Sequence, residues 1–202
     1  MGKLTMASSK PPAAELPIML FADTEAWAAW LDLHHAASPG LWLRLAKKDA
    51  EISSISYTQA LDLALCYSWI DSHKKGYDAE SWLQKFSPRK AKSIWSKVNC
   101  AKAEALISSG QMQPAGLAEV ERARQDGRWE AAYDSQRNAS VPADLQAALD
   151  ASPQAAAFFA TLSSVNRYAI LFRVQTAKKA ETRARRIQQF MAMLELHETI
   201  YP

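Results

Sequence analysis

The sequence predicts an α+β protein that is predominantly helical, with one small antiparallel sheet in the N-terminal half and an all-helical C-terminal half. Three observations lead to this prediction. Runs with the two-residue period of a strand occur only before Pro88. Helix caps and helical periodicity continue from there to the C-terminus. The length of 202 residues and the hydrophobic content of 49% are typical of a folded globular chain.

We expect three parts along the chain. Residues 1–16 are rich in Ser, Pro and Ala and show no periodicity, which indicates a poorly ordered arm. Residues 17–140 are predicted to form the α+β body, and residues 141–202 a helical C-terminal subdomain. The boundary lies near Val141 because the preceding residues 137–140 are typical of a loop.

The body begins with a helix followed by a strand. Asp23 or Thr24 is a suitable N-cap, and Trp27 and Leu31 lie four residues apart on one helical face. A helix is therefore expected here, ending before Pro39. Residues 41–47 alternate leucine with other residues, which is the period of a half-buried strand.

A second helix and two strands follow. Ser56 and Gln59 form a capping-box pattern, which predicts a helix over 57–67. Residues 69–73 and 81–86 flank a Gly-containing segment and are predicted to be two short antiparallel strands.

The remaining sequence contains the start and end signals of helices. Proline and serine mark starts, and glycine marks ends. The predicted helices cover residues 93–109, 114–126 and 142–150, a segment from Ser152-Pro153, and two further apolar stripes that contain Val165 to Phe172 and Ile187 to Leu194.

A collinear series of motifs runs through the chain after the arm. In order, it is Trp27-x-x-Trp30-Leu31, Lys47-Lys48, Cys66-Tyr67-Ser68-Trp69-Ile70-Asp71, Phe86-Ser87-Pro88-Arg89, Ser93-Ile94-Trp95-Ser96, Met112-Gln113-Pro114-Ala115-Gly116, Gly127-Arg128-Trp129 and Ala177-Lys178-Lys179-Ala180-Glu181-Thr182-Arg183-Ala184-Arg185-Arg186-Ile187. Together these motifs resemble the YdeI/OmpD-associated, or bacteriocin-protection, family. The resemblance implies protection against bacteriocins or cationic antimicrobial peptides, and it supplies no catalytic residues. The family more often has glycine where this chain has Ser68.

Basic residues interleaved with tryptophans suggest an anion-binding surface. The predicted ligand-binding residues are Lys47, Lys48, Arg89, Lys90 and Ser93, at strand ends and at the expected start of a helix, where unpaired N–H groups add to the side-chain charge. Further members of the cluster are Lys74, Lys75, Lys92, Lys97, Trp42, Trp69, Trp82 and Trp95. The alternative is that the lysines are merely solvated and the tryptophans belong to the core.

A second basic cluster surrounds the turn before the last helix. It contains Arg183, Arg185 and Arg186, which run against the dipole at a helix start and therefore need an acidic partner. That partner is either a carboxylate of this chain or a nucleic-acid phosphate. Nucleic-acid binding is the less favoured alternative, because the net charge is only +3.

An acid/base pair is the enzymatic alternative. Asp71 and His73 are two residues apart on a predicted strand, so they would point to the same face, beside Arg89. A strand-end aspartate that accepts turn N–H groups is the simpler explanation. The sequence contains no metal-site spacing and predicts no metal or cofactor.

The predicted location is the cytoplasm. The chain has no apolar run long enough for a membrane span and no export signal, and its two cysteines lack paired spacing. The resemblance implies a protection-type protein, and the basic cluster predicts that it binds an anionic ligand or partner. The alternatives are a small-molecule enzyme using Asp71, His73 and Arg89, and a weak nucleic-acid binder through the basic turn from Arg167 to Arg186, which also holds Arg173, Lys178 and Lys179.

Overall fold

The computed structural model describes residues 15–202, so all but the last two residues of the predicted N-terminal arm lie outside it. The chain divides into two compact units, of which the first ends at Arg89 and the second begins at Lys90. The boundary predicted near Val141 falls inside the second unit and stays a prediction. No helix within 15–202 has the length and apolar character needed to cross a membrane.

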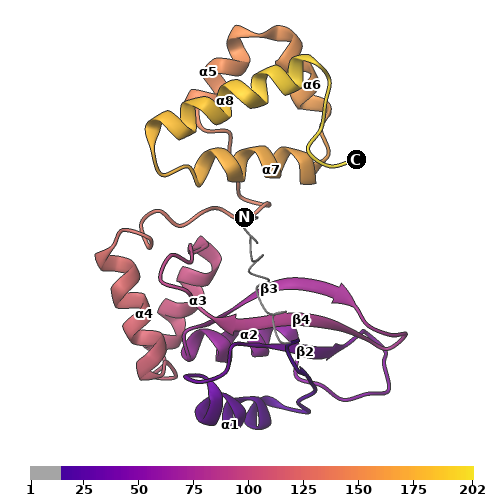
Figure 1. The fold of residues 1–202 in the computed structure, drawn as a ribbon, viewed down its shortest axis with the longest axis vertical. Coiled ribbons are helices and arrows are strands. Elements are labelled where there is room, and N and C mark those ends of the chain that lie inside the picture. Colours follow the sequence, from indigo (N-terminus) through magenta and orange to yellow (C-terminus); the bar gives the residue numbers. More distant parts are fainter. Residues whose placement is uncertain (1–14) are drawn as a thin grey trace, which may run out of the picture. The chain divides into compact units, whose positions relative to one another are not determined.

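The first unit contains a four-stranded sheet. Its strands are β1 (Ile18–Met19), β2 (Leu41–Ala46), β3 (Trp69–Gly76) and β4 (Ser81–Pro88), in the spatial order β1-β2-β4-β3. Figure 1 shows β4 between β2 and β3. β1 and β2 run parallel, while β4 is antiparallel to both β2 and β3. β4 is therefore a central strand that carries β2 on one side and β3 on the other.

Two helices cover one face of this sheet. Helix α1 (Thr24–His34) begins at Asp23, whose carboxylate accepts the Ala26 N–H, and α2 (Tyr57–Cys66) begins with the predicted capping box of Ser56 and Gln59. The Trp27 indole of α1 donates to the Ala60 carbonyl of α2. The structure thus selects Asp23 from the two candidate caps of α1 and confirms the capping box of α2. The hydrogen bonds that define such caps depend only on residues close in sequence.

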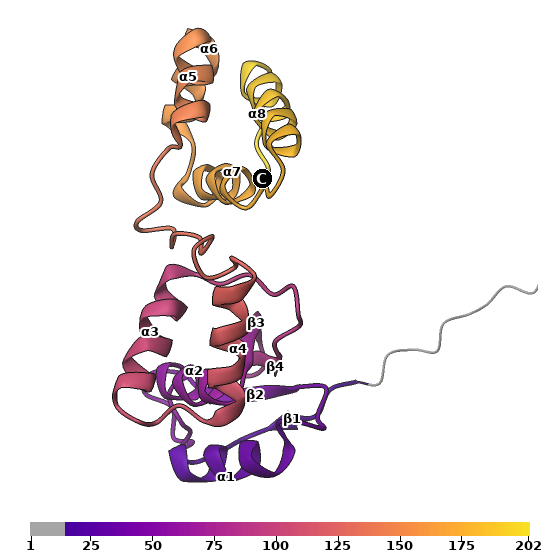
Figure 2. The ribbon, with the colours of Figure 1, turned by 90° about the vertical axis from the view of Figure 1, so that its left-hand side faces the viewer.

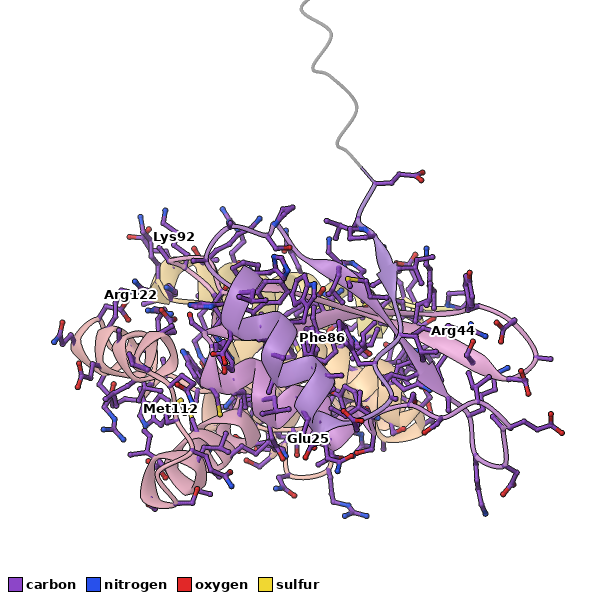
Figure 3. The ribbon with its side chains drawn as sticks, turned by 90° about the horizontal axis from the view of Figure 1, so that it is seen from below. Glu25, Arg44, Phe86, Lys92, Met112 and Arg122 are labelled. Carbon is purple, nitrogen blue, oxygen red and sulfur yellow. The ribbon has the colours of Figure 1, made fainter. Side chains whose placement is uncertain are left out.

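An aromatic core joins the helices to the sheet. Trp27 packs against Trp69 and Phe86, and all three are fully buried. Paired residues of neighbouring strands share a face, so Leu41 and Leu43, which pair with Phe86 and Gln84, line this face as well. Figure 3 shows Phe86 beside α1, while Arg44 lies on a part of the sheet that the helix leaves uncovered.

The second unit is built from six helices. They are α3 (Lys97–Ser108), α4 (Pro114–Gln125), α5 (Ala143–Ala151), α6 (Pro153–Thr161), α7 (Ser164–Gln175) and α8 (Ala180–Glu195). The last four share one apolar core, which includes Leu145, Phe159, Ile170 and Leu194. Figure 2 shows α8 facing the α5–α6 pair, with α7 lying across one end.

The fold-class prediction is wrong in two respects. The sheet is mixed rather than antiparallel, because the two-residue strand β1 pairs in parallel with β2. Helices account for 48% of the structure and strands for 14%, so the description as mainly helical is roughly correct. The region after Pro88 also forms a parallel bridge between Ser96 and Tyr133. β1 is too short to show a period, and a single bridge has no sequence signal.

The helix predicted to begin at Ser93 starts four residues later. Ser96 is the N-cap of α3 and accepts the Asn99 N–H. Ser93 instead closes a turn, in which its hydroxyl accepts the Lys90 N–H at 2.9 Å. Either serine satisfies the capping preference, and the bridge between Ser96 and Tyr133 holds the preceding residues in an extended conformation.

Candidate functional site

A pocket lined with lysines lies at one end of the sheet in the first unit. Its volume is about 530 Å³. It is lined by Ala46, Lys47, Lys48, Lys74, Lys75, Gly76 and Trp82. We call it the lysine pocket.

The strand order explains why these residues meet. β4 is antiparallel to both neighbours, so β2 and β3 run in the same direction and end at the same edge. Lys47 and Lys48 directly follow β2, and Lys74 and Lys75 directly precede the last residue of β3. One intervening strand separates the two pairs, which places their backbones roughly 10 Å apart.

The loop between β3 and β4 forms a fixed wall of this region. Lys47 Nζ donates to the Asp78 carbonyl at 2.7 Å and to the Ala79 carbonyl at 3.1 Å. The Asp78 carboxylate accepts the Ser81 hydroxyl at 2.6 Å and pairs with Arg44 at 3.0 Å. These bonds, that from Ser81 first, lower the pKa of Asp78 below its usual value. Asp78 is therefore committed to the loop and to Arg44.

Three cations near the pocket lie over aromatic rings. Lys74 Nζ is 4.2 Å from the ring centroid of Trp82, and Lys75 Nζ is 4.3 Å from that of Trp42. The Arg44 guanidinium lies 5.3 Å from the centroid of Tyr77. Lys74 pairs with Gln84 on the helix-covered face, whereas Lys75 pairs with Leu83 on the opposite face. The two lysines therefore flank the sheet end from both sides.

The four lysines of the lysine pocket form no salt bridge with the described residues. Within residues 15–202, none of its four lysines lies within 4.0 Å of a carboxylate oxygen. Ammonium groups gathered at one end of a sheet, on both of its faces, repel one another, and a bound anion relieves that repulsion. The arrangement is therefore suited to an anionic ligand.

The five predicted ligand-binding residues do not all meet. Lys47 and Lys48 line the lysine pocket, whereas Arg89 follows the far end of β4 and donates its N–H to the Ser68 carbonyl at 2.8 Å. The eight residues of β4 span roughly 23 Å, so Arg89 cannot contact a small ligand held by Lys47. Lys90 and Ser93 form the turn described above in the second unit.

The candidate acid/base residues Asp71 and His73 are separated by an irregularity of β3. The register shifts between Asp71 and Lys74, so the rule that residues two apart share a face does not hold there. Asp71 pairs with Phe86 and accepts the Tyr57 hydroxyl at 2.8 Å. Arg89 lies three residues beyond Phe86, on the other face by strand alternation. This geometry does not favour the enzymatic alternative.

The candidate nucleic-acid residues mostly bond within the second unit. Arg183 pairs with Asp144 through Nε at 2.5 Å and Nη2 at 2.8 Å, and its Nη1 donates to the Val174 carbonyl. Arg186 donates to the Arg173 carbonyl, while Arg185 is exposed on α8. The acidic partner expected for this cluster is thus supplied internally, by Asp144.

A buried ion pair of the second unit had no signal in the sequence. Arg128 Nη1 lies 2.8 Å from Glu119 Oε1, and both side chains are almost fully buried. Arg128 Nε also bonds Asp126, and this bond is the main reason why the pKa of Asp126 is lowered. Glu119 lies on α4 and Arg128 follows its end, so the pair fixes the turn after the helix.

No cluster of three potential metal ligands is present among residues 15–202.

Two protein families match different parts of the chain. Residues 19–119 match a family described as a domain of unknown function (DUF8412). Residues 138–196 match the family described as Bacteriocin-protection, YdeI or OmpD-Associated. The resemblance to the latter is confirmed over that segment, which contains the Ala177–Ile187 motif, while the earlier motifs lie outside it. No curated protein and no solved structure matches the chain.

Proposed function

The chain belongs to the family described as domain of unknown function (DUF8412), and we propose that it is a bacteriocin-protection type protein whose lysine pocket binds an anionic ligand. The family match over 138–196 supports the first part of the proposal. A location in the cytoplasm is part of the same proposal, supported by the two cysteines of the sequence, Cys66 and Cys100, which lack CxxC spacing.

The observation that carries the proposal is the convergence of Lys47, Lys48, Lys74 and Lys75 around one pocket. Lysines on a protein surface are usually dispersed and solvated, so their mutual repulsion is small. Here two neighbouring parts of the sheet bring four of them together, and no carboxylate oxygen of the described residues lies within 4.0 Å of their ammonium groups. Such an arrangement loses stability unless an anion offsets the repulsion.

The charge also limits how protection can work. A cationic antimicrobial peptide would be repelled by the lysine pocket, so its direct capture there is disfavoured. The pocket instead suits an anionic cellular component, and protection would follow from binding that component.

A protection assay with two paired variants tests the proposal. Lys48→Gln/Lys74→Gln removes one charge from each side of the pocket, and Lys90→Gln/Lys92→Gln removes two exposed charges of the second unit. In a strain lacking the protein and stressed with a cationic antimicrobial peptide, the second variant is expected to restore growth and the first is not. Both proteins are first shown to fold by circular dichroism.

Full protection by both variants would contradict the proposal. Loss of protection in both would mean that total charge, rather than the pocket, governs the effect. The Lys90/Lys92 variant thereby also tests the predicted role of Lys90.

A further inference from the structure

The chemistry of the lysine pocket favours a flexible polyanion over a small, precisely held anion. All seven lining residues lie on strands or directly after β2, so no helix N-terminus contributes. Lysine acts as a compact point charge on a flexible stem, whereas fixed anion sites use the planar fork of arginine or backbone N–H groups. Point charges of this kind tolerate many positions of a bound chain.

The spacing of the charges supports an extended ligand. Lys47 and Lys48 follow β2, and Lys74 and Lys75 lie on β3, with β4 between the two strands. The roots of the two lysine pairs are therefore roughly 10 Å apart. That span suits successive phosphates of one chain better than a single phosphate.

The aromatic rings beside the pocket add a second kind of contact. Trp82 and Trp42 are partly exposed, and about half of the Tyr77 surface is exposed. Each ring has a cation of this chain over it. A nucleobase stacked on an aromatic side chain is held more strongly than an exposed cation–π contact. A base can therefore displace Lys74 from Trp82, and the released ammonium can then bind a phosphate.

We infer that the lysine pocket binds single-stranded nucleic acid, whose bases stack on Trp82 at one face of the sheet end and on Trp42 and Tyr77 at the other. The inference rests on the proposed function, since it names the ligand class of the same pocket. Unpaired bases can stack on these rings, whereas the bases of a duplex are already stacked on one another. Single strands should therefore bind more tightly than duplexes of equal length.

Fluorescence anisotropy of a labelled 15-residue oligothymidylate, titrated with the full chain at several salt concentrations, tests the inference. Each lysine–phosphate contact with a single strand adds about 0.7 to the slope of log affinity against log salt, so four contacts give a slope of about −2.8. Lys48→Gln/Lys74→Gln should make this slope shallower by about 1.4. Lys90→Gln/Lys92→Gln should leave it unchanged.

Two further variants isolate the stacking. Trp82→Leu is expected to weaken oligothymidylate binding about tenfold and to change pyrophosphate binding less than twofold. Tyr77→Ala alters an exposed loop residue, so folding should survive, and a loss of about threefold is expected.

Each outcome decides between the two proposals. Binding of pyrophosphate without binding of the oligonucleotide overturns the nucleic-acid inference and leaves the proposed function standing. Binding of neither overturns both. Equal affinity for duplex and single strand, or full affinity in folded Trp82→Leu and Tyr77→Ala variants, excludes base stacking and overturns the inference.

Discussion

Ser68 has a backbone conformation that glycine adopts more easily. Its φ is +62°, in the left-handed region, and it joins α2 to β3. An L-residue is strained there by about 1 kcal/mol or more, because its Cβ approaches a carbonyl oxygen. The bacteriocin-protection family, which the motif around Ser68 resembles, more often has glycine at this position. The positive φ gives the physical reason for that preference.

Ser68→Gly should raise the free energy of unfolding by roughly 0.5–1 kcal/mol, since relief of strain exceeds the entropy cost of glycine. Urea denaturation of the two proteins measures the difference. Ser72→Gly is the control, because Ser72 is an exposed strand residue and should lose roughly 0.5–1 kcal/mol. A less stable Ser68→Gly protein would contradict this account of the turn.

The contacts of Arg183 connect three helices of the second unit. The side chain lies near the start of α8, pairs with Asp144 at the start of α5 and donates to a carbonyl in the last turn of α7. A helix C-terminus leaves carbonyls without intrahelical partners, and Arg183 and Arg186 satisfy two carbonyls near it. This explains how arginines are tolerated against the dipole of α8.

The ion pair with Asp144 should make stability depend on pH. The hydrogen bond from Arg183 is the main reason why the pKa of Asp144 is lowered in the folded state. A lowered carboxylate pKa contributes stability above the unfolded pKa, near 4, and that contribution is lost as the pH falls through the folded value. Asp144→Asn should therefore cost at most about 1 kcal/mol at pH 7, given its partial exposure, and less at pH 3.

Urea denaturation of the wild type and Asp144→Asn at both pH values measures this difference. Adding Arg183→Gln to Asp144→Asn should cost less than Arg183→Gln alone, because the pair is already broken. A cost of Asp144→Asn that is the same at pH 7 and pH 3 would exclude the proposed linkage.

How far the elements could be predicted depends on the range of the interactions that form them. The caps of α1 and α2 arise from residues three positions apart, so the sequence predicts them correctly. β1 has two residues and is therefore too short to show a period. The residues from Asp71 to Lys74 are all polar, so the sequence gives no sign of the register shift between them. The parallel pairing and the separation of Asp71 from His73 thus required the structure.

The lysine pocket illustrates the same limit at a functional site. Strand-end lysines at 47 and 48 are visible in the sequence, as are Lys74 and Lys75 within a larger basic cluster. Their convergence depends on β4 lying between β2 and β3, which is a non-local feature. The same order places Arg89 at the opposite end of β4, away from the lysines with which it was grouped.

At the scale of the whole molecule, we propose that the last four helices form an independent folding unit, as the predicted boundary near Val141 implies. Their shared core draws only on residues between Ala139 and Ile200. A fragment of residues 138–202 is expected to be helical by circular dichroism and to unfold in one cooperative thermal transition. A fragment without a cooperative transition would place the boundary elsewhere.

The central claim is that the lysine pocket binds anions, and titration calorimetry with pyrophosphate at low salt tests it most directly. The account predicts saturable binding to the wild type and to Lys90→Gln/Lys92→Gln. In Lys48→Gln/Lys74→Gln, the loss of two charges should weaken binding about tenfold. Absence of binding to the wild type, or equal affinity in all three folded proteins, would contradict the account.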